Sequence, residues 1–148
     1  MSRRPSAEVV RAWAQLVRTE QAVLAAVERD LKAAGFPPLA WYDVLWGLTR
    51  ASEGRLRPLE IQHETLLAQY NLSRLLDRLE REGLIARKPC GDDRRGQWIA
   101  ITAAGRALRE RMWEDYAKAI QRHVGDKLDS VSATALGDLL GRLAPESA

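Results

Sequence analysis

Residues 72–105 read LSRLLDRLEREGLIARKPCGDDRRGQWIAITAAG, and they are the most informative part of the chain. Its leucines recur at the i, i+3, i+4 and i+7 spacing of one apolar helical face: Leu72, Leu75, Leu76 and Leu79. Gly83 is the residue type that most readily ends a helix in the left-handed conformation. Two short apolar runs, 84–86 and 98–101, flank a segment rich in Pro, Gly and Asp, which predicts a β-hairpin. A new helix is predicted to begin at Thr102.

The helical face opposite the leucines is charged. It carries Tyr70, Arg74, Asp77, Arg78 and Arg81, flanked by Asn71 and Ser73. Taken alone, this face is equally typical of an ordinary solvated surface helix. The predicted hairpin, however, places Arg94 and Arg95 near its tip, and guanidinium groups are attracted by the negative potential of a DNA minor groove. A helix followed by such a hairpin therefore favours duplex DNA as the partner.

The stretch from Leu72 to Leu108 resembles the MarR (multiple antibiotic resistance regulator) family of winged helix-turn-helix proteins. Asp93 and Arg95 match the Asp-x-Arg of the family's wing, and Ile101, Thr102 and Gly105 match the start of its next helix. The resemblance extends over nearly the whole chain. It implies a homodimeric DNA-binding regulator, usually a repressor, that is often released by a small molecule.

Upstream, residues 41–61 (WYDVLWGLTRASEGRLRPLEI) also resemble the family's helix before the DNA-binding unit. The chain departs from the family at the start of the recognition helix. Many members have a serine-rich stretch there, whereas residues 68–71 read AQYN in this chain. The preferred DNA sequence therefore cannot be transferred from relatives.

From this arrangement we expect three kinds of DNA contact. Four residues are expected to contact base edges: Gln69, Asn71, Ser73 and Arg74. Tyr70 lies near the centre of the same exposed face. Three residues are expected to contact phosphates: Arg78, Arg81 and Lys88. Arg95 is expected to enter the minor groove, with Arg94 as the alternative. Asp93 is expected to support the wing, because a short carboxylate can accept bonds from a turn and brace an arginine fork.

The predicted fold class is mainly α (α+β), a winged helix-turn-helix with long terminal helices for dimerisation. The chain is interpreted as a single domain, 1–148, with the DNA-binding unit at about 39–102 and the terminal helices at about 6–34 and 103–144. Helices are predicted at 6–34, 39–51, 58–65, from about 68, from 102 to 124 and from about 132, with residues 56–57 as a short strand beside the wing. The terminal helices are too apolar for one small core, so we expect them to pack against each other and a second copy.

Composition sets the broad class. The 148 residues are 46% apolar and carry a net charge of +3, which is permissive for nucleic acid. No apolar run approaches the roughly 20 residues needed to span a bilayer, and the N-terminus lacks a signal-like segment. We therefore expect no membrane partner and a cytoplasmic, nucleoid-associated protein. The single cysteine, Cys90, fits a reducing compartment; its basic surroundings leave redox sensing open beside a tolerated thiol.

The sequence offers no sign of an enzyme. It lacks a Gly-rich phosphate loop and a nucleophile elbow, so neither catalysis nor a cofactor is expected. The two histidines, His63 and His123, are far apart and lack metal-ligand spacing, so no metal is expected. His63 with Glu60 and Glu64 is a weaker alternative to an ordinary surface helix.

The family resemblance implies an effector pocket between the dimer helices and the DNA-binding unit. Candidates to line it for a small aromatic or anionic effector are Trp13, Arg18, Trp41, Tyr42, Trp46 and Trp113. Arg18 is the candidate to hold a carboxylate, although core packing is the commonest use of such aromatic residues. Two alternatives to a regulator stay open: a protein-interaction module built from the same helices, and a non-specific architectural DNA binder.

Overall fold

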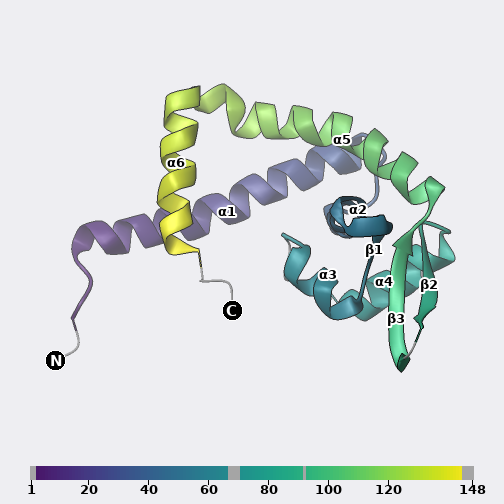
Figure 1. The fold of residues 1–148 in the computed structure, drawn as a ribbon. Coiled ribbons are helices and arrows are strands. Elements are labelled where there is room, and N and C mark those ends of the chain that lie inside the picture. The colour runs from purple at the N-terminus through teal and green to yellow at the C-terminus, as the bar shows by residue number, and fades with distance from the viewer. Residues whose placement is uncertain (1–2, 67–70, 92, 145–148) are drawn as a thin grey trace. The chain divides into compact units, whose positions relative to one another are not determined.

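The computed structural model describes residues 3–66, 71–91 and 93–144, with residues 93–95 described by their backbone alone. Figure 1 shows these residues as helices and a small antiparallel sheet, from purple near the N-terminus to yellow near the C-terminus. The chain divides into two compact units, residues 31–115 and the described parts of 1–30 and 116–148. Within the described residues, no helix has both the length and the apolar character needed to cross a bilayer.

The first unit has the element order of a winged helix-turn-helix. Its elements are α2 (Leu39–Arg50), a 3-10 turn (Ser52–Gly54), β1 (Arg55–Leu56), α3 (Pro58–Glu64), α4 (Leu72–Arg81), β2 (Ile85–Cys90), β3 (Asp93–Ile101) and the start of α5 (Ala103–His123). The strands form one antiparallel sheet in the order β1-β3-β2. The predicted fold class, mainly α with a small sheet, is confirmed.

The core of this unit is built around α2. Seven residues of that helix are buried: Leu39, Tyr42, Asp43, Val44, Leu45, Gly47 and Leu48. They are joined in the core by Ile61 of α3, Leu79 of α4, Ile99 of β3 and Met112 of α5, none of which is more than 1% exposed. The helix predicted at 39–51 is therefore the one around which the core of this unit forms, since it is apolar on much of its circumference.

The junction between α4, the hairpin and α5 is closed by a few backbone contacts. Gly83 adopts a φ of 75°, and the Leu84 amide donates to the Leu79 carbonyl at 2.9 Å, which ends α4. The Thr102 amide donates to the Leu84 carbonyl at 3.1 Å, and the Thr102 hydroxyl donates to the Gly83 carbonyl at 2.7 Å. Gly105 approaches the same place so closely that a Cβ there would collide with the Leu84 carbonyl oxygen.

Several predicted boundaries need correction in the hairpin and its neighbours. The strands were predicted at 84–86 and 98–101, but β2 continues to Cys90 and β3 starts at Asp93, so most of the expected loop is paired sheet. The short first strand is Arg55–Leu56 and lies one residue earlier than predicted. Pro89 and Gly96 are typical turn residues, and for that reason the sequence predicted a loop here. In the structure both lie in paired strands, because a β-bulge between Pro89 and Cys90 shifts the register and lets the pairing continue.

The second unit is entirely helical where it is described. It contains α1 (Ala7–Ala33) as far as Asp30, α5 from Tyr116, a 3-10 turn (Gly125–Lys127) and α6 (Ser130–Leu143). Ser6 caps α1, since its Oγ accepts from the Val9 amide at 3.3 Å. Asp30 accepts from Arg122 at 3.1 Å and lies 2.9 Å from Nε2 of His123.

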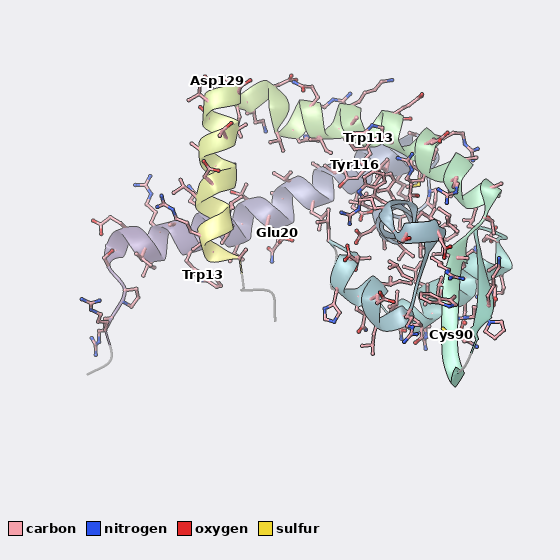
Figure 2. The ribbon with its side chains drawn as sticks, in the orientation of Figure 1. Trp13, Glu20, Cys90, Trp113, Tyr116 and Asp129 are labelled. Carbon is pink, nitrogen blue, oxygen red and sulfur yellow. The ribbon has the colours of Figure 1, made fainter. Side chains whose placement is uncertain are left out.

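The last helix begins at Ser130, two residues before the predicted Ser132. The reason is its cap: Asp129, labelled in Figure 2, accepts a hydrogen bond from the Ser132 amide at 2.7 Å. That backbone hydrogen bond lowers the pKa of Asp129 below its ordinary value. The helix therefore keeps a charged N-cap throughout the neutral pH range.

This unit exposes a large apolar surface. On α6, Val131 is 79% and Leu143 is 68% exposed, and α6 buries none of its residues. On α1, Trp13 is 66% exposed, and Figure 2 shows it on the part of the helix nearer the N-terminus. Such extended apolar exposure exceeds what an isolated chain commonly shows.

Gly105→Ala should destabilise the protein by about 1–3 kcal/mol, because the new methyl group forces backbone at Leu84 to move. Urea unfolding followed by circular dichroism measures the change. Gly141→Ala is the matched control: it lies in α6, away from the leucine face, and a Cβ there meets nothing within 4 Å. That control should be neutral or slightly stabilising, since alanine favours helix. Equal stability of the two variants would contradict the close approach at Gly105.

Candidate nucleic-acid interface

Helix α4 presents one apolar and one charged face, as its sequence predicts. Leu76 and Leu79 are buried at 3% and 0% exposure. The opposite side exposes Ser73, Arg74, Asp77, Arg78 and Arg81 to solvent. The helix therefore fixes a row of polar side chains on a rigid support, which is the arrangement that reading base edges requires.

The start of α4 differs from the prediction. The helix begins at Leu72 and not near Ala68, because Asn71 is its N-cap: the Asn71 side-chain oxygen accepts from the Arg74 amide at 3.1 Å. Asn71 was expected to contact bases, and its oxygen is instead engaged within the protein. Gln69 and Tyr70 lie outside the described residues.

The predicted phosphate contacts fall into two groups. Arg81 and Lys88 are exposed, and neither forms an ion pair with a described residue. Arg78 is held within the protein, with its Nε 3.3 Å from a Glu82 carboxylate oxygen and its Cζ 5.9 Å from the centre of the Trp41 ring. Of these side chains, Arg78 is thus the one whose charge is already partly compensated.

A salt-bridge pair that the sequence reasoning missed joins the hairpin to α4. Nη2 of Arg87 donates to Asp77 and Nη1 donates to Glu80, both at 2.8 Å. The hydrogen bond to Asp77 raises the pKa of Arg87, although partial burial opposes the rise. The guanidinium therefore stays charged and fixes the angle between β2 and α4. The only local sign was alternation along β2, which turns Arg87 to the same side as Ile85.

The distal wing is described in part. The backbone of residues 93–95 belongs to β3, with Asp93 opposite Cys90. The side chains of Asp93, Arg94 and Arg95 lie outside the described residues. Figure 2 labels Cys90 on the hairpin, and its side chain is only 5% exposed. A buried thiol is poorly accessible to oxidants, which favours the tolerated cysteine over the redox sensor.

The candidate effector residues do not form one group. Tyr42 stacks with Trp46 and with Trp113, at ring-centre distances of 6.5 and 6.3 Å. Arg109 lies over Trp46 at 5.0 Å, and its buried Nε has no hydrogen-bond partner among the described residues. Sequence reasoning missed Arg109, whose place on the first part of α5 becomes meaningful only once α2 packs beside it.

The remaining candidates lie elsewhere. Trp41 lines a separate open hollow of about 710 Å³ together with Leu84 and Leu108. Trp13 and Arg18 belong to the α1 part of the other unit, and both are exposed. Three of the six predicted residues, Tyr42, Trp46 and Trp113, are therefore brought together by the structure. The described residues contain no group of three potential metal ligands.

Asp43 anchors the connection that leads to α4. Its side chain is 5% exposed, and its Oδ1 accepts from the Leu66 amide at 2.8 Å. Arg50 holds the end of α3, since its guanidinium donates to the Glu64 carbonyl at 3.2 Å. These contacts tie the helix-turn-helix connection to α2, the most buried helix of the unit.

Residues 34–96 match the model of the MarR family. These residues form a MarR family domain. It is 28% identical over 105 residues to the HTH-type transcriptional repressor YetL of Bacillus subtilis and 31% identical over 103 residues to the HTH-type transcriptional regulator PecS of Dickeya dadantii. Each match covers 69% of this chain but only 63% and 61% of those relatives.

The fold is also similar to that of a MarR family protein of known structure. The structure of Sco3205, a MarR family transcriptional regulator from Streptomyces coelicolor in complex with DNA, matches with a TM-score of 0.83 at 25% identity. The match covers 97% of this chain and 89% of Sco3205. The family resemblance drawn from the wing and the start of α5 is thereby confirmed.

Asp43→Ala should lower the free energy of unfolding by about 1–3 kcal/mol, since it removes the buried carboxylate that accepts from the Leu66 amide. Asp43→Asn is the matched control because its amide oxygen can still accept from Leu66, so the loss should be smaller. Denaturant unfolding compares the two, and hydrogen exchange at the Leu66 amide locates the effect. Unchanged exchange at Leu66 in the alanine variant would disprove the anchoring role.

Proposed function

We propose that this MarR family member is a homodimeric regulator of transcription that binds duplex DNA sequence-specifically, acting as a repressor by covering a promoter. The observation that carries this proposal is the rigid pairing of α4 with the wing through Arg87, which fixes an exposed polar helix face beside a protruding hairpin. We infer no enzymatic step, because the matched relatives are transcriptional regulators, and we infer a cytoplasmic, nucleoid-associated protein.

The proposed contacts follow from the exposed residues of the first unit. Ser73 and Arg74 lie on the outer face of α4 and are assigned to base edges, with Gln69, Tyr70 and Asn71 at the approach to that helix. Arg78, Arg81 and Lys88 are assigned to phosphates. Arg95 is assigned to the minor groove, with Arg94 as the alternative and Asp93 as the wing support. The Arg78 contact requires that guanidinium to exchange Glu82 for a phosphate oxygen.

Dimerisation is proposed to use the second unit. The exposed leucines of α6 and the exposed Val9, Val10 and Trp13 of α1 provide an apolar surface that a second copy would cover. Two recognition helices held roughly 34–36 Å apart would enter successive major grooves of a pseudo-palindromic site. We accordingly assign about 39–102 to DNA binding and about 6–34 and 103–144 to dimerisation.

Arg74→Ala and Arg95→Ala should each weaken binding to the operator by about 1–3 kcal/mol while leaving the dimer intact. Fluorescence anisotropy with the promoter of the protein's own gene, a scrambled duplex and a salt series measures the loss. Lys118→Ala is the matched control, since it removes an exposed charge from α5 outside the first unit.

Three outcomes separate the possible functions. Tight, salt-sensitive and sequence-selective binding supports a regulator. Equal affinity for both duplexes points to an architectural DNA binder. An absence of binding at low salt points to a protein-interaction module built on the same helices. Unchanged affinity in both arginine variants would overturn the residue assignments.

An effector is proposed to act on the aromatic cluster of Tyr42, Trp46 and Trp113. Arg109 beside it has a desolvated Nε–H with no partner among the described residues, so the chemistry suits a small aromatic carboxylate. Binding would release DNA by favouring a dimer whose recognition helices are wrongly spaced. Trp13, Arg18 and Trp41 were also predicted for this pocket, and Arg109 replaces Arg18 as the proposed anion ligand.

Benzoate should quench tryptophan fluorescence and release operator DNA, whereas cyclohexanecarboxylate should act more weakly because it lacks an aromatic ring. Arg109→Gln should abolish the benzoate response and preserve DNA affinity, as Arg109 lies outside the proposed DNA contacts. Arg18→Gln tests the earlier assignment. An unchanged benzoate response in the Arg109 variant would refute the anion site.

A further inference from the structure

The register of the sheet sorts its residues onto two faces. Side chains directly opposite each other in an antiparallel pair point to the same face. Ile99 of β3 pairs with Leu56 of β1 and Arg87 of β2, and this face packs inward, with Ile99 fully buried and Arg87 tied to α4. Trp98, one residue earlier, therefore belongs to the opposite face.

That outer face carries a row of basic side chains around one aromatic ring. Lys88 pairs with Trp98, and Arg57 directly follows Leu56, the last residue of β1, which pairs with Ile99 next to Trp98. The Arg57 Cζ lies 5.2 Å from the Trp98 ring centre. We call Lys88, Trp98 and Arg57 the basic row. These three residues are distant in sequence and come together only when β1 and β2 pair with β3.

The charges of this row remain available. Arg55 also lies over Trp98, at 4.5 Å, but its guanidinium is 2.8 Å from a Glu53 carboxylate. Arg57 and Lys88 are exposed, and neither forms an ion pair with a described residue. Arg55 thus packs the ring, while the charged groups of the other two have no ion-pair partner among the described residues. Glu60 accepts from the backbone amide of Arg57 at 3.0 Å.

Stacking prepares Arg57 to bind an oxyanion. A guanidinium that lies on an aromatic ring uses its flat face, and its N–H donors point outward in the guanidinium plane. The ring also restricts a side chain that otherwise loses much conformational freedom when it binds. Five donors in a fixed fork match the oxygens of a phosphate group.

The position of Arg57 fits a phosphate of duplex DNA. Arg57 is the residue immediately before α3, the first helix of the helix-turn-helix, and in such units the first helix crosses the DNA backbone. We propose that the basic row is a third DNA contact, in which Arg57, positioned by Trp98 and assisted by Lys88, binds a backbone phosphate outside the footprints of α4 and the wing tip. This inference rests on the proposed DNA-binding function.

A phosphate contact carries no sequence information, so its loss has a characteristic signature. Arg57→Gln should weaken binding to operator and scrambled duplex by the same factor. The slope of log affinity against log salt should become shallower by about 0.9 for each subunit that binds. At 0.1 M salt this corresponds to about an eightfold loss of affinity for each contact.

Three further variants separate charge from positioning. Arg57→Lys keeps the charge but lacks the planar fork, so the salt slope should be retained while affinity falls. Trp98→Leu should likewise weaken binding with little change of slope, whereas Trp98→Phe retains a ring and should lose less. Lys118→Gln, which removes a charge on α5, controls for the change in net charge. Thermal unfolding of each variant checks that its fold is retained.

The outcomes distinguish this inference from the proposed function. If Arg57→Gln binds DNA with wild-type affinity and slope while Arg74→Ala is impaired, the basic row is not a DNA contact although the protein is a DNA-binding regulator. If the unsubstituted protein binds no duplex at low salt, both proposals fail. A loss confined to the operator would overturn the phosphate assignment, since it would mean that Arg57 reads sequence.

Discussion

The winged helix-turn-helix unit depends on one peptide group, the carbonyl of Leu84. It lies where α4 has ended, β2 is about to start and β3 returns to start α5. The carbonyl accepts from the Thr102 amide, and α5 can begin at that distance only because Gly105 has no side chain. A single close backbone approach thereby sets the positions of two helices and both ends of the hairpin.

The two faces of the sheet have different roles. The inner face connects the hairpin to α4 by apolar burial at Ile99 and by the fork of Arg87 on two carboxylates. Exposed ion pairs of this kind contribute only about 0.2–1 kcal/mol each, so their importance lies in orientation more than in stability. The outer face is left with cations that stack on Trp98 and need no contact with the core.

Local pattern was sufficient for most of the fold and for part of the site. Leucine spacing identified the buried side of α4, and Gly83 and Thr102 identified the ends of adjacent helices, because each acts within a few residues of sequence. Contacts across the sheet could not be predicted from local sequence patterns. Arg57 and Trp98, for example, come close only because β1 pairs with β3. The capping role of Asn71 was not anticipated because capping and base contact favour the same residue type, and the sequence alone does not separate the two uses.

The fork of Arg87 also limits how this protein can evolve a new binding preference. Asp77 and Glu80 lie on the recognition helix, yet both carboxylates are committed to holding the hairpin. Drift at those positions would change the angle of the wing together with any contact to bases. Under the proposed function, new preferences for DNA would therefore arise mainly in the first turn of α4 and its approach, and a foreign helix grafted in place of α4 would keep the angle of the wing if it carried these two carboxylates.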